Sequence, residues 1–488
     1  MRKIVYPLFY ITAVFTLFSC KKSFLEVIPL GEQVAVTTHD YDQLMNDPAF
    51  YIDRYAGGWQ DPELMGDEVA VEAPFINQYS KWSMLLFQWQ AVIYKDGDMP
   101  PFALSHFLSE LYTLNKIINE VMNSQDGTDA DKARILAEAK ATRAWTYFQL
   151  VNYYAKPYAA ATAGTDPGFP IITKADVNGG PYARGTVQET YDFIIKDFTD
   201  AITSLPVKAV IQTRMSKPAA EGLLGKVYLF MGRNADALQM FNAAFTDLAA
   251  NSSVRLYDYN QEFAAGGVFQ PIDPTYGPQG PGKNYNDLTE AVVSKIFPNT
   301  SYNGNGLCND GLVLTPATQA LFRAGDLRLL LYTNKNPDGS PNAGGRLRKY
   351  GVQYSRYGLQ LSELYLLRAE AEARANDLAG AKTDLEVLRS HRMPAADATV
   401  PAATAGNQNA LIKFVIDERI REFALEGYRW FDMRRLSVDP LFAGMVFTHV
   451  QYNADGTTTE YHMDQPNRLT LRLPPNIING NTGMENNP

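Results

Sequence analysis

The chain contains few of the residues on which many catalytic and metal sites depend. Of its 488 residues, only two are cysteine and five are histidine. No two histidines have the spacing of a helical zinc site, and no Gly-x-Ser-x-Gly nucleophile elbow occurs. Cys308 has no basic neighbour in the sequence, so a cysteine nucleophile is not indicated. These absences leave no catalytic residue, cofactor or metal ligand to predict.

Basic charge is also scarce. The 44 Lys and Arg residues are outnumbered by 53 Asp and Glu residues, which gives a formal net charge of −9. Removal of Arg2 and Lys3 with a leader would make it about −11, because 42 basic residues would then face 53 acidic ones. Nucleic-acid binding needs a basic surface. We therefore expect no nucleic-acid partner.

Long apolar runs are confined to the N-terminus. Arg2 and Lys3 precede an apolar stretch at Ile4–Phe18, which ends in Ser19-Cys20. This order is typical of a bacterial lipoprotein signal peptide over residues 1–19, with Cys20 acylated. An uncleaved membrane helix is the alternative, and the Ser19-Cys20 ending disfavours it. Acylation of Cys20 would leave Cys308 alone, so no intrachain disulfide is expected.

The remainder of the chain reads as a tether followed by one folded body. Lys21-Lys22-Ser23 begins a polar tether predicted over 20–40. A single domain is predicted over 41–488, and the apolar fraction of 46% is enough for a full hydrophobic core. Membrane attachment would then depend on the lipid alone.

Helical periodicity dominates the body. Apolar or small residues recur at spacings of three and four in three stretches, beginning at Ala137, Ala237 and Leu378. The last two stretches follow another helix after a short break, and Gly225 aligns with Ala369. Such paired helices resemble tetratricopeptide hairpins. We therefore predict a mainly α fold, a scaffold of helical hairpins with long irregular insertions.

Two segments lack this periodicity, and one hairpin is indicated. Residues 51–101 and 251–316 are rich in turn residues and aromatics, which favours functional loops over disorder. Val446–Tyr452 and Thr457–Met463 flank Asn453-Ala-Asp-Gly456, a β-hairpin signal. These strands are expected to be local, and His449 and His462 could meet across them.

Three short motifs are interpreted as turns. Gly277–Asn284 has the spacing of a phosphate-binding loop, but Asn284 replaces the Ser or Thr that holds magnesium, and its prolines remove amide donors. Asp96-Gly-Asp98 and Asp338-Gly339 are typical of turns, and this interpretation is preferred to calcium ligation. None of the three predicts a ligand.

Glu418–Arg435 mixes charges with large apolar residues on almost every face of one predicted helix. Several Arg and Glu side chains should therefore be partly buried and paired. Pairing would lower the pKa of the carboxylates, which suits a scaffold better than a general acid.

The same elements carry a family resemblance. Glu418–Arg435 resembles the C-terminal signature of SusD/RagB proteins, surface lipoproteins of Bacteroidota. Four other segments are similar to this family in the same order: Glu138–Val151, Arg184-Gly-Thr, Leu205-Pro206 and the helix from Pro218 to Gly232.

The resemblance implies a function and a location. SusD-like proteins capture glycans at the outer surface of the outer membrane and form a lid over a SusC-like TonB-dependent transporter barrel. The resemblance does not identify any ligand-contacting residue in this sequence. The expected partners are therefore this barrel, an oligosaccharide and, through the N-terminal lipid, the membrane.

The candidate ligand-binding residues come from the two irregular segments. Aromatic rings can stack on sugar faces, and amides can bond to hydroxyls at the rim. The chain contains 28 Tyr and 5 Trp. The residues predicted to bind the ligand are Trp59, Trp82, Tyr276, Tyr285, Asn286, Tyr302 and Asn303.

Several alternatives stay open. The spacing of Trp82 and Trp89 equally suits two core residues on one helical face. A peptide could occupy a groove rich in Tyr and Asn. A surface glycoside hydrolase, or a lid with little affinity of its own, is also compatible with the sequence.

Overall fold

A computed structural model of the chain describes residues 35–52, 60–75, 82–95, 98, 102–251, 253–284, 286–298, 311–336, 338–342, 344–350 and 354–488. The predicted signal peptide, Cys20 and most of the tether lie outside these residues. Within them, none of the helices combines the length and apolar content required to span a bilayer. The predicted limits of the signal peptide, the tether and the single domain remain predictions.

The N-terminal half consists of packed helices, as predicted. α2 (Thr38–Leu44) contacts α5 (Phe102–Glu120) and α6 (Asp129–Tyr154). α6 packs on α7 (Val187–Ile202), which contacts α8 (Lys217–Phe230). Three of these helices begin with a capping box, in which a Thr and the acid three residues later satisfy free backbone N–H groups. The boxes are Thr37/Asp40, Thr128/Asp131 and Thr186/Glu189.

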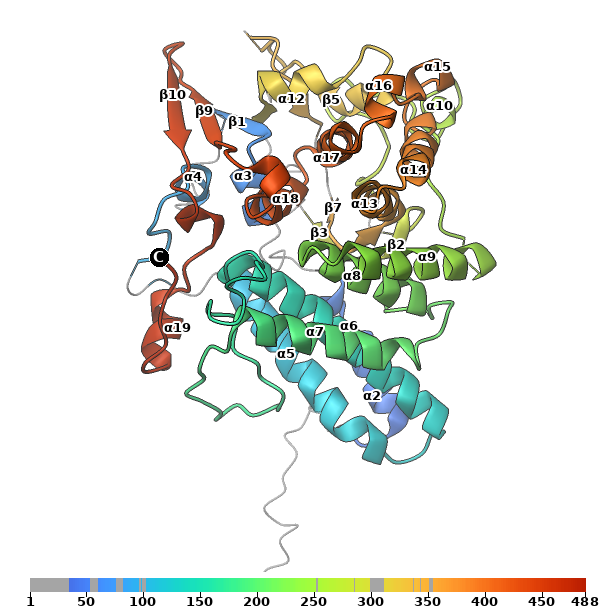
Figure 1. The fold of residues 1–488 in the computed structure, drawn as a ribbon, viewed down its shortest axis with the longest axis vertical. Coiled ribbons are helices and arrows are strands. Elements are labelled where there is room, and N and C mark those ends of the chain that lie inside the picture. Colours follow the sequence, from blue (N-terminus) through green and yellow to red (C-terminus); the bar gives the residue numbers. More distant parts are fainter. Residues whose placement is uncertain are drawn as a thin grey trace, which may run out of the picture.

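The two predicted helical hairpins are present and stack on one another. α8 pairs with α9 (Asn234–Asn251), and α13 (Leu361–Arg374) pairs with α14 (Leu378–Ser390). α13 also contacts α9, so the hairpins form adjacent layers (Figure 1). Gly225 allows the close approach, because a Cβ there would lie 2.6 Å from the ring of Phe241.

The charged segment is not the single helix that its sequence predicts. α17 (Gln408–Phe423) ends before Ala424, and α18 (Tyr428–Leu436) begins four residues later. Leu425 and Gly427 take positive φ angles of 63° and 83°, which a continuing right-handed helix excludes. Gly427 adopts this conformation without a steric penalty.

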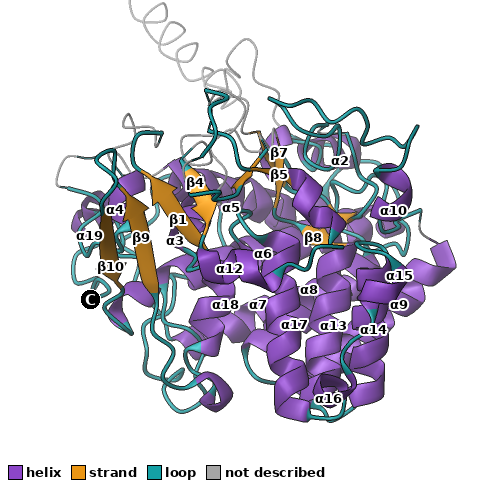
Figure 2. Ribbon diagram, turned by 90° about the horizontal axis from the view of Figure 1, so that it is seen from above, coloured by secondary structure: helices purple, strands orange, loops and turns teal. Residues whose placement is uncertain are grey.

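The predicted hairpin forms, but its strands are not local. β9 (Thr448–Tyr452) pairs antiparallel with β10 (Thr458–His462). β9 also pairs in parallel with β1 (Val69–Glu72), which pairs antiparallel with β4 (Leu312–Leu314). The result is a four-stranded sheet with the order β10-β9-β1-β4. In both views it lies at one side of the molecule, away from α10 (Tyr259–Glu262) and α14 (Figures 1 and 2).

The irregular segments contain several short elements. β2 (Ala291–Val293) and β3 (Ile296–Pro298), from the second segment, pair with β8 (Leu359–Gln360) and β7 (Tyr354–Arg356), which precede α13. Other short α-helices and strands of the molecule are α3 (Gln60–Met65), α4 (Ser83–Phe87), α10 (Tyr259–Glu262), α12 (Pro316–Leu321), α15 (Ala395–Ala398), α16 (Ala402–Ala405), α19 (Pro475–Gly480), β5 (Tyr332–Thr333) and β6 (Arg348–Lys349).

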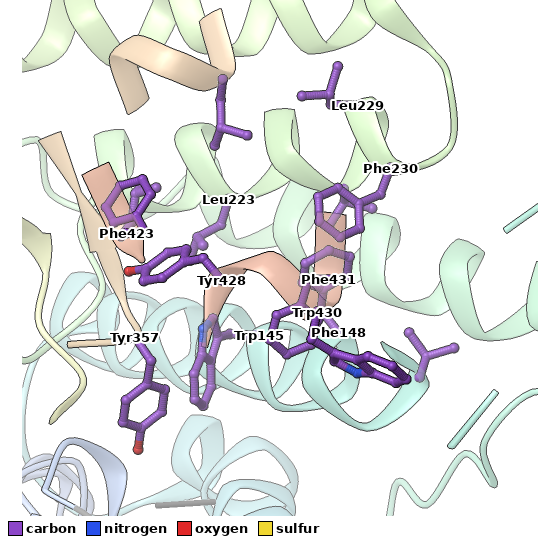
Figure 3. Close-up of a cluster of buried hydrophobic side chains, with 14 of the residues drawn as sticks. Trp145, Phe148, Leu223, Leu229, Phe230, Tyr357, Phe423, Tyr428, Trp430 and Phe431 are labelled. Carbon is purple, nitrogen blue, oxygen red and sulfur yellow. The ribbon is translucent and has the colours of Figure 1, made fainter. Parts of the chain in front are cut away.

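Much of the aromatic content belongs to the core. Trp145 of α6 belongs to the same buried cluster as Tyr428 and Trp430 of α18 (Figure 3). In this cluster Phe423 stacks on Tyr428 with 4.2 Å between ring centroids. Trp89 is also a core residue. It is buried and stacks on His449 at 3.7 Å, and its Nε1 donates to the carbonyl of Met65. The alternative prediction that Trp89 is a core residue is therefore confirmed.

His449 is a structural residue of this core. Its ring lies between those of Phe87 and Trp89, and both ring nitrogens are 2.6 Å from backbone carbonyl oxygens. In the hairpin register it pairs with Tyr461, whereas His462 pairs with Thr448. The two histidines therefore do not face each other across the hairpin.

Candidate ligand-binding site

The charges of α17 and α18 are buried and paired within the scaffold. Glu418 is completely buried and accepts hydrogen bonds from Arg328, Arg389 and Arg421 at 2.6–2.7 Å. In α18, Asp432 accepts from Arg419 and Arg435 at 2.8 Å. The prediction of internal pairing in this segment is confirmed.

The pairing controls the protonation of these carboxylates. Burial alone would raise the pKa of Glu418, but Arg328, Arg421 and Arg389 outweigh it and hold the pKa far below the ordinary value. The pKa of Glu370 falls to about 2 for the same reason, because Arg435 and Arg374 outweigh its burial. A carboxylate that stays ionised in this way is a poor proton donor.

A small pocket lies where the second irregular segment covers the C-terminal end of α17. We call it the α10 pocket, and its volume is ≈ 70 Å³. Its wall combines aromatic, cationic and carboxylate side chains from five separate stretches of chain. Among the residues that line it are Tyr259, Pro278, Pro281, Lys283, Glu290, Lys349, Tyr350, Arg356, Gln360, Glu422 and Glu426.

Short strands and ion pairs position the polar wall. Arg356 is the last residue of β7, and Gln360 is the last residue of β8. Nη1 and Nη2 of Arg356 donate to the backbone carbonyls of Asp287 and Asn284. This contact fastens the loop of the irregular segment to β7.

The carboxylates of the pocket all have cationic partners. Arg392 Nη2 lies 2.8 Å from both Glu290 Oε1 and Glu422 Oε1, and Lys349 Nζ donates to Glu426. Burial raises the pKa of Glu290 despite Arg392, whereas Arg392 and Arg328 outweigh burial at Glu422 and lower its pKa.

Two of the predicted binding residues do not line this pocket but are exposed next to residues that line or hold its wall, a position that we call its rim. Tyr276 is 69% exposed, on a turn in which Asp273 accepts hydrogen bonds from the backbone N–H groups of Thr275 and Tyr276. Lys283, which lines the pocket, donates to the carbonyl of Tyr276 at 2.6 Å. Asn286 is exposed between Asn284 and Asp287, the two residues bound to Arg356.

Trp82 belongs to a different surface. It is partly buried beside α4, with its ring edge-on to Tyr94 at 5.6 Å. α4 lies at the opposite side of the molecule from α10 in both views (Figures 1 and 2). The structure therefore does not bring Trp82 together with Tyr276 and Asn286. Trp59, Tyr285, Tyr302 and Asn303 lie outside the described residues.

Sequence reasoning missed most of the pocket wall. Tyr259, Arg356 and Gln360 belong to short elements whose pairing is not visible in the sequence. One signal was available, because Gln360 immediately precedes the predicted helix at Leu361. Within the described part of the chain, no three His, Cys, Asp or Glu residues gather in a way that could hold a metal ion.

Two family models match the chain. A SusD-like model described as "Starch-binding associating with outer membrane" matches residues 23–229. The SusD_RagB model, described as "SusD family", matches residues 317–488. The chain belongs to the SusD/RagB family. Residues 230–316, which include part of the α10 pocket, lie between the two matched ranges.

Solved SusD-family structures share this fold across almost the whole chain. A SusD superfamily protein from Bacteroides thetaiotaomicron has a TM-score of 0.70 and 18% identity, over 93% of this chain and 100% of its own. A SusD-like carbohydrate binding protein from Bacteroides vulgatus has a TM-score of 0.60 and 17% identity, over 93% of both chains.

A laminarin binding SusD-like protein has a TM-score of 0.63 and 17% identity, over 92% of this chain and 98% of its own. At these identities the likeness shows the fold alone. No curated protein matches the sequence significantly. The predicted mainly α fold of the SusD type is confirmed.

Proposed function

We propose that this protein is a lipoprotein of the outer membrane that captures oligosaccharides at the cell surface. In the same proposal it forms the lid of a SusC-like TonB-dependent transporter barrel. The observation that carries the proposal is the SusD fold, which extends over nearly the whole chain. A laminarin binding SusD-like protein has the same fold. The exposed Tyr276 beside the α10 pocket supplies an aromatic platform for a sugar ring.

The proposed activity is binding without chemical change. The buried carboxylates of α17 and α18 are held as anions by arginines, so they support the scaffold and donate no proton. Incubation of the purified protein with polysaccharides should release no new reducing ends. Release of reducing ends would replace this proposal by a surface glycoside hydrolase.

Isothermal titration calorimetry against neutral and acidic oligosaccharides tests the capture proposal. We expect at least one glycan to bind and Tyr276→Ala to weaken it about tenfold, because loss of one stacked ring removes roughly 1–1.5 kcal/mol. Tyr112→Ala is the matched control, because Tyr112 is a tyrosine 41% exposed on α5.

Each contrary result has a definite meaning. Binding of peptides but of no glycan would contradict the glycan assignment in favour of a peptide-binding lid. Equal glycan affinity of Tyr276→Ala and the unaltered protein would show that the rim of the α10 pocket is not the capture site.

A further inference from the structure

Two donor groups of the α10 pocket have no acceptor in the described protein. Gln360 is 5% exposed and Arg356 is 8% exposed, and both line the pocket. Among the described residues, neither Gln360 Nε2 nor Arg356 Nε has a hydrogen-bond acceptor. Buried donors in a native protein are nearly always satisfied. These two groups therefore suit an occupant that presents oxygen acceptors.

The two side chains are not engaged in local structure through these atoms. Gln360 is the N-cap residue of α13, but its side chain makes no capping hydrogen bond. Arg356 is held through Nη1 and Nη2 by the carbonyls of Asp287 and Asn284. The guanidinium is fixed on one edge, whereas its buried Nε–H has no hydrogen-bond partner among the described residues.

The charges of the pocket are already balanced by internal pairs. Glu290 and Glu422 share Arg392, and Glu426 is bound by Lys349. An anionic ligand would approach these three carboxylates. The cations of the wall are already engaged: Arg356 Nη2 lies 3.3 Å from Asp287 Oδ2, and Lys283 donates to the carbonyl of Tyr276. A cationic ligand would find no carboxylate without a partner. Bringing a charge into such a site is unfavourable unless it gains a pair of its own.

Resting on the proposed glycan-binding function, we propose that the α10 pocket takes a neutral, hydroxyl-bearing sugar unit and discriminates against uronic acids and free amino sugars. Gln360 Nε2 and Arg356 Nε donate hydrogen bonds to oxygens of this unit. Tyr259 and Tyr350 in the wall offer apolar surface to its ring. The volume of ≈ 70 Å³ admits only part of one unit, which favours the end of a glycan over the middle of a chain.

A microarray of neutral, uronate-containing and free amino-sugar glycans tests the ligand class on the mature full-length protein. We expect the bound glycans to be neutral. For confirmation, oligogalacturonates are compared by calorimetry with the neutral oligosaccharides made by reducing their carboxyl groups. The acidic member should bind more weakly than its reduced counterpart, and equal affinities would contradict the inference. Preferential binding of charged glycans would overturn the inference and leave glycan capture intact.

Variants of Gln360 test the location. Gln360→Met keeps the size of the side chain but removes the donor, so the Kd for the bound neutral glycan should rise about fivefold. Gln360→Glu, which replaces the donor by an acceptor, should raise it at least as much. Gln43→Met on α2 is the control for an exposed glutamine. Unchanged affinity in both Gln360 variants would overturn the inference. Absence of any glycan binding, with peptide binding instead, would remove the proposed function itself.

Discussion

The pKa values of buried carboxyl groups in this protein shift in two opposite directions. Glu418 and Asp432 are surrounded by arginines and remain ionised. Glu63 and Glu68 are equally buried, but burial dominates and raises the pKa of each to about 8. Ser355 donates to Glu63 at 3.0 Å, which only partly offsets the effect of burial. Among these four carboxylates, hydrogen-bonded arginines rather than depth distinguish the lowered pKa values from the raised ones.

The raised pKa of Glu68 predicts a pH dependence of stability. The folded state holds the proton up to about pH 8, whereas the unfolded chain releases it near pH 4.5. The stabilisation is complete below the unfolded pKa and is lost as the pH rises through about 8. Between pH 6.5 and 8, one such group lowers the free energy of unfolding by about 2 kcal/mol.

Glu68→Gln should remove this part of the slope. Urea denaturation at several pH values measures the free energy of unfolding, and the variant should lose less stability than the unaltered protein between pH 6.5 and 8. Glu460→Gln is the control, because its side chain is 61% exposed. A slope unaffected by Glu68→Gln would show that Glu68 is ionised in the folded protein.

Removal of one buried partner should be far more damaging than removal of a surface one. Glu418→Gln leaves Arg328, Arg389 and Arg421 without their shared carboxylate. We expect a loss of roughly 3–5 kcal/mol in the free energy of unfolding. The exposed control Glu460→Gln should change it by less than about 1 kcal/mol. Comparable effects of the two variants in thermal and chemical denaturation would contradict this account of the α17 charges.

At the level of elements, the helical hairpins depend on small residues at their contacts. Gly225 of α8 faces the ring of Phe241 from α9, and the backbones approach closely because no side chain intervenes. The alignment of Gly225 with Ala369 in the sequence anticipated this arrangement in both hairpins. Pairing of the strands was not anticipated, since β1, β4 and β9 are far apart in the sequence.

Gly225→Ala should destabilise the α8–α9 hairpin. The added methyl would lie 2.6–3.1 Å from the ring of Phe241, a clash that costs about 1–3 kcal/mol. The better helix propensity of Ala offsets roughly 1 kcal/mol of this. Gly480→Ala on α19 is the control, because a Cβ there meets nothing within 4 Å. Thermal denaturation should therefore show a lower Tm for Gly225→Ala alone.

At the level of the whole molecule, attachment to the membrane is predicted to depend on Cys20. No described helix has the length and apolar content to span a bilayer, so the acyl chains of a lipoprotein would supply the anchor. Cys20→Ser should abolish incorporation of labelled palmitate and move the protein out of the membrane fraction. Cys308→Ser is the matched control. Retention of Cys20→Ser in the membrane would favour the uncleaved membrane helix.

The architecture of the candidate site combines distant parts of the chain. The α10 pocket takes residues from the second irregular segment, from β6 to β8 and from the end of α17. The sequence placed Tyr276 and Asn286 in a segment suited to binding, and the structure puts both at the rim. It did not indicate Gln360 or Arg356, because the unpaired donor on each becomes evident only when all neighbours are known.

Local patterns determined the helices and the hairpin turn, since each depends on residues a few positions apart. They also indicated that charges of Glu418–Arg435 would be buried and paired, but most of the partners, such as Arg328 and Arg389 for Glu418, are distant in the sequence. Tertiary structure alone decided that α17 stops at Phe423, that Trp89 is buried while Tyr276 is exposed, and that His449 is a core residue. These outcomes depend on which distant side chains compete for the same space and the same hydrogen bonds. The spacing of residues along the chain does not show which of these distant side chains meet.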